Sequence, residues 1–542
     1  MAGENPYIPK KRTIFAPKST KEVMKSRIFL WVFSLSAVFS VQAQQQRSLT
    51  DGLEYRLSAE GTVGGGDHAP LWLNANKYGL SSVETSSGYL RAAVARPLQA
   101  DSLRRWGIGY GAELAVAANF TSTLVVQQAY VEARWLKGTL TVGSKEQSLE
   151  LKNQLLSTGS QTLGINARPV PSIRLALPDY WTVPHTKQWI AIKGHVAYGM
   201  TTDDNWQKDF TGGTSKYTKN TLLHTKAGYL RIGPKNITME LGLEMAAQFG
   251  GKSYVNRYDS GYQWYENGSG LKDFLAAFVP GMGAEVVEDQ YKNSEGNHLG
   301  SWGGRLNLDY PKWNLGIYGE HFYEDQSTMY FLGNNGYGTG DNWNVRKKGD
   351  MFVYDFKDMM AGAELTLKQC RWLRSIVLEY LYTKYQGGPV YHDHTPKSNI
   401  QITGRDEFYN HYIFTGWQHW GQVIGNPLYR SPIYNDNQDI EILNNRFKAW
   451  HLGLGGQPLR GMSYRLLATW QQGFGTYKHM YPDPKEVVCL LGEVGYSFAD
   501  TTPLAGWHVR GAVGMDRGGI YGDNTGVQLT VTKTGLLNPR KK

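Results

Sequence analysis

The sequence predicts an all-β fold: a closed transmembrane β-barrel of antiparallel strands whose long loops lie on one rim and occlude the lumen. Three observations predict it. Long segments alternate large apolar residues with small or polar ones, which is typical of strands with two different faces. Short connections alternate with long ones along the chain. The mean hydropathy is -0.44 although 41% of the residues are hydrophobic, which excludes a bundle of membrane helices.

Residues 1–43 predict a secretory signal peptide that precedes the fold. An apolar stretch, IFLWVFSLSAVFSV, follows Lys25 and Arg27 and is followed by a small-residue cleavage site ending at Ala43. The stretch has 14 residues, whereas a membrane helix needs about 20. Met24 is well placed to be the true start, and residues 44–54 form a short lead-in to the first strand.

Charge and cysteine content exclude two further classes of protein. Half of the formal net charge of +10 comes from the leader, so the exported chain has no nucleic-acid signature. Cys370 and Cys489 are the only cysteines, which is too few for a disulfide framework. They are either two isolated thiols or one bridge.

The clearest strand is WGIGYGAELAVAANF at residues 106–120. Its large residues fall on one face, and glycine, alanine, Glu113 and Asn119 fall on the other. Its length exceeds the ~9 to 11 residues that cross the hydrocarbon of a membrane. We therefore expect the large face to contact lipid, with Trp106 and Phe120 in the two interfacial aromatic girdles.

Charged residues in other strands lie opposite the large apolar side chains. Glu240 and Glu244 do so in residues 236–249, and Arg510 does so near the C-terminus. An apolar exterior around a polar interior is the inverse of a soluble barrel and is typical of outer-membrane barrels. These three residues are interpreted as polar lining of the lumen, with acid–base catalysis as the alternative.

Eighteen segments, to within two, carry this pattern and fill a barrel over residues 55–535, which leaves a C-terminal tail at 536–542. In order, they begin near Tyr55, Tyr89, Trp106, Thr123, Gly138, Val170, Gln188, Leu222, Asn236, His298, Lys312, Asp358, Leu373, Lys448, Met462, Glu486, Ala505 and Asn524.

The connections after every second strand are mostly tight turns, whereas the others are often long. The long ones lie near 146–169, 201–221, 250–297, 326–357 and 387–447. Outer-membrane barrels have short periplasmic turns and long outer loops. The sequence therefore predicts a bacterial outer-membrane location with the long loops facing the cell exterior.

Four stretches of the sequence resemble a known family. They are DHAPLWLNANKYGL (67–80), GSKE (143–146), NARPVP (166–171) and FYNHYIFTGWQHWGQVIGNPL (408–428), of which the last is the most specific. Together they are similar to the outer-membrane capsule-assembly Wzi family, in the form found in Bacteroidetes-type bacteria. The resemblance runs from about Tyr55 to the C-terminus.

This resemblance implies an 18-stranded barrel whose loops occlude the lumen. It also implies a surface lectin that helps hold exported capsular polysaccharide on the cell. The better-known members carry an N-terminal helical bundle, whereas only Gln44 to Glu54 precede the first strand here. Any function of that bundle is therefore not expected of this chain.

The long segment at 387–447 is the candidate polysaccharide-binding site. Aromatic rings stack on the apolar faces of sugar rings, while amides, carboxylates and imidazoles bond to the hydroxyls. The alternative is that these aromatic residues form the core of a folded plug. The candidate binding residues are Asp406, Tyr409, Asn410, His411, Trp417, His419, Trp420 and Asn426.

Other chemistry has less support in the sequence. His392, Asp393 and His394 could ligate a metal together with His411 or His419, but solvated loop residues are the expected interpretation. A nucleophile elbow, a P-loop, a Rossmann fingerprint and zinc-ligand spacing are absent from the sequence. We therefore predict a binding protein that is not an enzyme and needs no metal or cofactor.

The expected partners are capsular or exported polysaccharide, outer-membrane lipid and, during biogenesis, the barrel-assembly machinery, with no nucleic acid. A general or substrate-selective diffusion porin is the alternative function, because barrels of this size can enclose an aqueous channel. Loop content discriminates between the two, since a porin needs an open lumen.

Overall fold

The computed structural model describes residues 49–257, 261–279, 286–287, 290–291, 296–324, 340–343, 345, 358–392, 397 and 402–538. Residues Thr50–Lys542 form one compact unit. The predicted leader at 1–43 and most of the connection at 326–357 lie outside the described residues.

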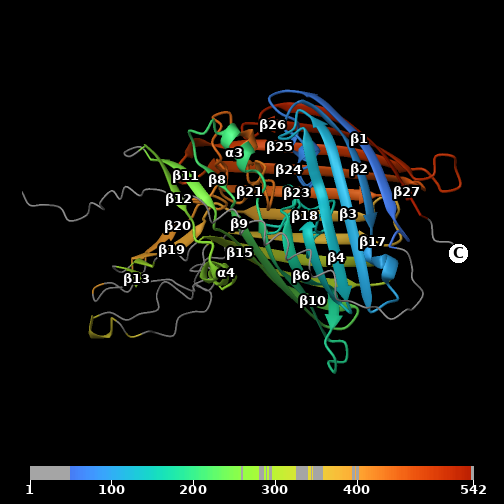
Figure 1. The fold of residues 1–542 in the computed structure, drawn as a ribbon, viewed down its shortest axis with the longest axis horizontal. Coiled ribbons are helices and arrows are strands. Elements are labelled where there is room, and N and C mark those ends of the chain that lie inside the picture. The colour runs from blue at the N-terminus through green and yellow to red at the C-terminus, as the bar shows by residue number, and fades with distance from the viewer. Residues whose placement is uncertain are drawn as a thin grey trace, which may run out of the picture. The chain divides into compact units, whose positions relative to one another are not determined.

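Eighteen strands form one antiparallel sheet (Figure 1), and the last strand pairs with the first, so that the sheet closes into a barrel. The barrel strands are β1 (Glu54–Gly65), β2 (Ser86–Arg96), β3 (Trp106–Ala118), β4 (Leu124–Trp135), β5 (Gly138–Ser144), β6 (Ser172–Thr182), β7 (Ile190–Met200), β9 (Leu222–Ile232), β10 (Ile237–Phe249), β15 (Asn297–Asp309), β16 (Trp313–Glu324), β17 (Met359–Leu367), β18 (Ser375–Tyr382), β23 (Phe447–Gly456), β24 (Met462–Gly475), β25 (Met480–Ser497), β26 (Trp507–Gly518) and β27 (Asn524–Leu536).

The prediction of an 18-stranded transmembrane barrel is confirmed. All predicted starts fall within three residues of the observed ones except that of β25, which begins at Met480 instead of near Glu486. Pro482 and Pro484 interrupt the strand pattern there, because proline lacks an N–H for the ladder. β24 and β25 nevertheless continue as a paired hairpin as far as Gly475 and Met480.

The two faces of the sheet differ as the alternation predicts. Along β3, Trp106 is 58% exposed and Val116 is 59% exposed, whereas Glu113 between them is buried. Ten residues separate Trp106 from Val116. A rise of about 3.4 Å per residue and a tilt of about 35–45° make that distance about 25 Å along the barrel axis. This is the height expected of the apolar band of an outer-membrane barrel.

Short connections define one rim, here named the turn side, and long connections define the other, here named the loop side. The turn-side connections are 97–105, 136–137, 183–189, 233–236, 310–312, 368–374, 457–461 and 498–506. The loop-side connections are 66–85, 119–123, 145–171, 201–221, 250–296, 325–358, 383–446, 476–479 and 519–523.

Aromatic residues gather where the strands end on the turn side. The rings of Trp106 and Trp135 stack with centroids 5.9 Å apart, and those of Tyr310 and Trp313 lie 4.7 Å apart. This arrangement is typical of an interfacial aromatic girdle. The girdle prediction is wrong for Phe120, which packs edge-on against the inward-facing Tyr89 with centroids 6.1 Å apart.

The physical reason is the backbone just before Phe120. β3 ends at Ala118, and Asn119 follows with a left-handed φ of 59°. The amide of Asn119 donates to the carbonyl of Ser86 at 2.7 Å, which fixes the turn. Asparagine tolerates this conformation better than most residues, so the chain bends inward one residue before the ring.

Short elements lie within the connections. They are α2 (Leu71–Asn74), η2 (Leu98–Asp101), α3 (Asp204–Phe210), β8 (Tyr217–Lys219), β11 (Lys252–Arg257), β12 (Gly261–Glu266), α4 (Leu271–Phe278), β13 (Val286–Val287), β14 (Gln290–Tyr291), η3 (Gly340–Asn342), β19 (Gly387–His392), β20 (Ile402–Arg405), β21 (Gln418–His419), β22 (Gln422–Val423) and η4 (Pro432–Tyr434). Within the described ranges, no helix has the length and apolar character that crossing a bilayer requires.

Candidate functional site

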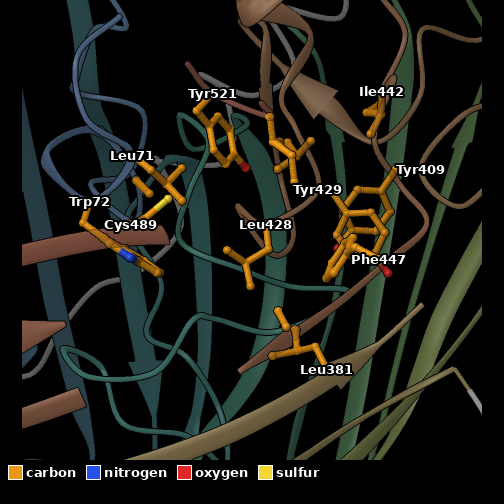
Figure 2. Packing of buried hydrophobic residues seen from close by; sticks show 14 of the residues in the cluster. Leu71, Trp72, Leu381, Tyr409, Leu428, Tyr429, Ile442, Phe447, Cys489 and Tyr521 are labelled. Carbon is orange, nitrogen blue, oxygen red and sulfur yellow. The ribbon is translucent and has the colours of Figure 1, made fainter. Parts of the chain in front are cut away.

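Three loop-side connections fold into the lumen and form a plug: the 66–85 loop, the 145–171 loop and the described part of the 383–446 loop. Their apolar side chains join those of the barrel wall in one buried cluster. Figure 2 shows part of it, with Leu71, Trp72, Leu381, Tyr409, Leu428, Tyr429, Ile442, Phe447, Cys489 and Tyr521 labelled. The expected polar interior therefore holds only in part, because the plug brings its own apolar core into the lumen.

Carboxylates of the barrel wall anchor the 145–171 loop. Glu379 on β18 accepts hydrogen bonds from the backbone N–H of Thr158 at 2.8 Å, from its hydroxyl at 2.7 Å and from the hydroxyl of Ser157 at 2.5 Å. Glu320 on β16 accepts from the N–H of Gln161 at 3.0 Å and pairs with Lys152 at 2.5 Å. Hydrogen bonds to a charged acceptor are the strong ones. These luminal charges therefore bind the protein's own loop.

Glu244, predicted as luminal lining, takes part in the same anchoring. Its carboxylate accepts from the N–H of Leu163 at 3.1 Å, from the hydroxyl of Ser160 at 3.1 Å and from that of Tyr229 at 2.7 Å. Arg510 instead lines an open polar cavity of about 540 Å³ in the turn-side half of the lumen. Both residues face the interior, as the alternation predicts.

The 383–446 loop supplies the centre of the plug. The ring of Tyr409 stacks on that of Tyr429 with centroids 3.9 Å apart. The indole N–H of Trp417 donates to the carbonyl of Thr162 at 2.8 Å, and the amide of Asn426 donates to the hydroxyl of Thr158 at 3.0 Å. The two loops therefore interlock through buried hydrogen bonds between residues far apart in the sequence.

Sequence reasoning did not identify the 66–85 loop as part of the plug. In this loop, α2 places Leu71, Trp72 and Leu73 in the buried cluster. The backbone N–H of Leu71 donates to Asp516 at 2.9 Å, and the indole of Trp72 donates to Thr469 at 3.0 Å. The available signal was a run of three apolar residues directly after a proline, which does not follow the strand alternation.

The structure divides the predicted binding residues into two groups. Four have side chains that are fully buried in the plug: Tyr409, Trp417, His419 and Asn426. Four are partly buried: Asp406, Asn410, His411 and Trp420. A side chain in the first group has no surface to offer a polymer in this arrangement.

Within the partly buried group, polar atoms bind neighbouring parts of the same loop. The amide of Asn410 both donates to and accepts from the backbone of Ile442, at 3.1 Å and 2.9 Å. Nδ1 of His411 accepts from the backbone N–H groups of Ile413 and Phe414 at 3.1 Å and 3.2 Å. Asp406 accepts from the N–H of Glu407 at 2.9 Å. Of the eight, Trp420 is the one tyrosine or tryptophan that is not buried.

Trp420 belongs to a small aromatic patch on the loop side. We define the aromatic patch as Trp206, Phe210 and Trp420, with Arg168 beside them. The rings of Trp206 and Phe210, both from α3, stack at 4.9 Å, and those of Trp206 and Trp420 lie 6.5 Å apart. The guanidinium of Arg168 lies 4.3 Å from the ring centroid of Trp420. All three rings are partly exposed.

Two residues of the 201–221 loop hold Trp420 in place. Its backbone N–H donates to Asp203 at 2.9 Å, and its indole N–H donates to the hydroxyl of Thr202 at 3.3 Å. Its φ of 54° lies in the left-handed region, which is costly for a bulky side chain and clusters at functional sites. The hydrogen bonds to Asp203 and Thr202 therefore hold Trp420 in this strained backbone conformation.

His419 connects the two sides of the aromatic patch. Its Nε2 accepts from the backbone N–H of Thr202 at 3.2 Å, so its Nδ1 carries the proton that is donated to the carbonyl of Arg168 at 2.7 Å. Burial lowers the pKa of His419, which keeps the ring neutral. Burial likewise lowers the pKa of Arg168 to about 10, opposed by the charge of Asp203. Arg168 is still protonated at neutral pH.

The structure also bears on the predictions for the two cysteines and for a metal site. Cys370 and Cys489 are both free thiols. His411 and His419 are committed to the contacts given above, and the side chains of the 392–394 segment lie outside the described residues. In the part of the chain that the structure describes, no group of three or more His, Cys, Asp or Glu residues is arranged to hold a metal ion.

Comparison with known proteins agrees with this architecture. The family model for the capsule assembly protein Wzi matches residues 72–341. Wzi of Escherichia coli, an outer membrane protein involved in group 1 capsule assembly and a carbohydrate binding β-barrel, is 12% identical with a TM-score of 0.53, covering 96% of this chain and 90% of its own. At this identity the structural likeness shows the fold alone. No curated protein matches the chain.

Two further solved structures are less similar. OccAB4 of Acinetobacter baumannii is 10% identical with a TM-score of 0.42, covering 91% of this chain and 99% of its own. OccK3 of Pseudomonas aeruginosa is 11% identical with a TM-score of 0.42, covering 90% and 96%. With the matched family model and the closed barrel of 18 strands, the chain belongs to the Wzi capsule assembly family and is an outer-membrane β-barrel.

Proposed function

We propose that this chain is a polysaccharide-binding protein of capsule assembly, which holds capsular or exported polysaccharide at the cell surface through its loop side. Family membership supports the role in capsule assembly. The carbohydrate binding of the Escherichia coli Wzi barrel supports the class of ligand. The proposal covers binding without cleavage.

The aromatic patch is the observation that carries the choice of site. Rings that are partly exposed and held rigidly can stack on the apolar faces of pyranoses without a large ordering cost. The exposed residues Thr202, Asn205 and Asp209 lie beside the rings in sequence and can bond to sugar hydroxyls. The guanidinium of Arg168 adds a positive charge under one ring.

We assign different roles to the predicted residues within this proposal. Trp420 contacts polymer directly, together with Trp206 and Phe210. The buried residues Tyr409, Trp417, His419 and Asn426 position the plug that carries the patch. Asp406, Asn410 and His411 order the adjoining part of the 383–446 loop.

A diffusion porin is not favoured, because the plug fills the loop-side half of the lumen with a buried apolar cluster. A porin of this strand number leaves an aqueous channel. Outer-membrane lipid and the barrel-assembly machinery remain the other proposed partners, since the exposed apolar belt needs lipid around it.

The test is polysaccharide binding by patch variants of the full chain in detergent micelles. Trp420→Ala and Trp206→Ala should each weaken the affinity for capsular polysaccharide by about three- to tenfold, as expected for the loss of one aromatic stack. The polysaccharides are first presented to the protein on a glycan array. The matched control is Trp264→Ala, because Trp264 is 58% exposed on β12 and lies outside the patch.

Retained heat-resistant migration on a gel shows that each variant still forms the barrel. If both patch variants bind polymer as tightly as the parent, the site assignment is wrong. If no variant and no parent protein binds any polysaccharide, the proposed function itself is wrong.

A further inference from the structure

The helix α4 lies on the outer wall of the barrel. In β10, Glu244 faces the lumen, so Ala247 and Phe249 face outward. The outward residues Met239 and Leu241 of the same strand are 48% and 40% exposed, yet the exposed fractions of these two are 0% and 2%. Both belong to a cluster with Ala277 of α4. In Figure 1, α4 lies beside the loop-side ends of β9 and β10.

Aromatic contacts fasten the inner face of the helix to three strands. The ring of Phe274 lies 5.0 Å from that of Phe249 on β10 and 5.2 Å from that of Tyr198 on β7. The hydroxyl of Tyr198 also donates to the carbonyl of Phe274 at 2.9 Å. The ring of Phe278 lies 5.6 Å from that of His224 on β9. Tyr198 and His224 are an outward-facing pair in register.

The face of the helix beside this inner face is also apolar. Leu271 is 79% exposed and Leu275 is 47% exposed, and Phe278 and Val279 continue the same line with 38% and 42%. Leu271, Leu275 and Val279 follow one another at steps of four residues, and Phe278 lies three residues after Leu275, which places these side chains on one stripe of an α-helix. We name these four residues the outer stripe of α4. A short helix with apolar side chains both on its inner face and on a second face that the barrel does not cover needs an apolar environment around both.

The height of the helix on the barrel identifies the apolar environment that its outer stripe meets. Ala247 lies ten residues beyond Ile237, the first outward residue of β10 on the turn side. A rise of about 3.4 Å and a tilt of about 35–45° place Ala247 about 25 Å from the turn-side edge, where the apolar band ends. The exposed Met200 at the end of β7 continues the band up to the helix.

From these contacts we propose that α4 is an interfacial helix, which seats the outer stripe among the acyl chains of the outer leaflet while its inner face packs on the barrel. The occupant of the stripe is lipid, because the stripe is continuous with the lipid-facing belt. The polar residues of the first turn fit the membrane boundary: Asp273 caps the helix by accepting from the N–H of Gly270 at 2.6 Å, and Lys272 is exposed. The helix thereby ties residues 271–279 to the membrane surface.

The test uses the full chain in phosphatidylcholine vesicles, with a fluorophore attached to an introduced cysteine. Leu275→Cys and Leu271→Cys are made in a Cys370→Ser background, and the buried Cys489 stays unlabelled. Lipid brominated on its acyl chains should quench both labels strongly, and aqueous iodide should quench them little. The matched control is Asp209→Cys, at an exposed position of the loop-side helix α3, where the pattern should reverse.

Two results would overturn the proposal. Labels at both positions that iodide reaches and brominated lipid does not quench would place the stripe in water. Labels that neither reagent quenches would place it against protein, such as a second copy of the chain. Because two separate positions are labelled, failure of one variant to insert leaves the other to decide. Polysaccharide binding is not part of the readout, so this result is independent of the proposed function.

Discussion

Trp417 shows what a predicted binding residue does when it is buried. None of its side chain is exposed, and its indole N–H donates a hydrogen bond to the carbonyl of Thr162. Tyr409, earlier in the same loop, carries a left-handed φ of 69°, as Trp420 does with 54°. Tyr409 and Trp417 thus maintain the shape of the 383–446 loop, whereas Trp420 is partly exposed at the rim and Tyr412 is 56% exposed.

Replacing Trp417 should loosen the contact between two loops. Trp417→Ala leaves a cavity and should destabilise the plug by about 3–5 kcal/mol, whereas Trp417→Phe should cost less because it keeps most of the ring volume. Faster hydrogen exchange of the backbone amides of residues 157–163 would report the loosening. Unchanged exchange combined with lost polymer binding would contradict the structural role.

Acid should loosen the plug through His411. Its Nδ1 accepts two backbone hydrogen bonds and must be unprotonated to do so. Burial, with the charge of Lys216 second, lowers its pKa from 6.5 to about 3. The stabilisation is therefore complete above pH 6.5 and is lost as the pH falls from 6.5 towards 3. At pH 5 the loss reaches ~2 kcal/mol.

Hydrogen exchange of Ile413 and Phe414 at pH 7.5 and 5, corrected for intrinsic rates, measures this effect. His411→Asn is the control, because its side-chain oxygen can accept in place of Nδ1 and does not titrate. Equal pH dependence in the parent and in this variant would rule out His411 as the cause.

Within a single strand, neighbouring residues should respond very differently to the same change of charge. Leu241 on β10 is 40% exposed on the lipid face, and Glu240 beside it faces the lumen. Leu241→Arg should cost ~2 to 4 kcal/mol near the midplane, whereas Glu240→Gln adds the same unit of charge on the lumen side and should cost under about 1 kcal/mol. Denaturant unfolding in lipid vesicles measures both, and equal costs would contradict the assigned faces.

The carboxylate on β18 should decide whether the 145–171 loop stays docked. Glu379→Gln replaces an acceptor of four hydrogen bonds, including one from the hydroxyl of Tyr318 at 2.6 Å. We expect the loop to loosen by about 2–3 kcal/mol, seen as faster exchange at residues 157–163. Asp101→Asn is the control, because the buried Asp101 pairs with Arg96 at 2.9 Å on the turn side, away from those residues. Equal exchange in the two variants would contradict the anchoring role.

For the whole barrel, the plug predicts poor conduction. Single-channel recordings of the intact protein in planar bilayers should show little current, because one buried cluster joins the wall to three loops. Replacing residues 387–446 by a short linker should raise the current substantially, since the 145–171 loop loses the partners of Thr158 and Thr162. Large currents from the intact protein would favour a porin, and unchanged currents after deletion would show that the other two loops seal the lumen alone.

The barrel itself could be predicted from local patterns, and most of the candidate site could not. Alternation identified the strands and their faces because every second residue meets lipid or the lumen, a condition that each strand satisfies alone. The alternation misplaced Phe120, because Asn119 directly before it has a left-handed φ and turns the chain inward. The 66–85 loop, Trp206 and Phe210 were missed because short loop elements carry no period.

By itself, the sequence determined the fold class, the strand positions, the face that contacts lipid and the family. Only the tertiary structure decided which aromatic residues are buried and which form the aromatic patch. The reason is distance along the chain: Trp417 meets Thr162 across 255 residues, and Trp420 meets Trp206 from a different loop. Such contacts exist only after the barrel closes and brings the loops together. Whether an aromatic side chain is buried therefore depends on these distant partners and not on its neighbours in the sequence.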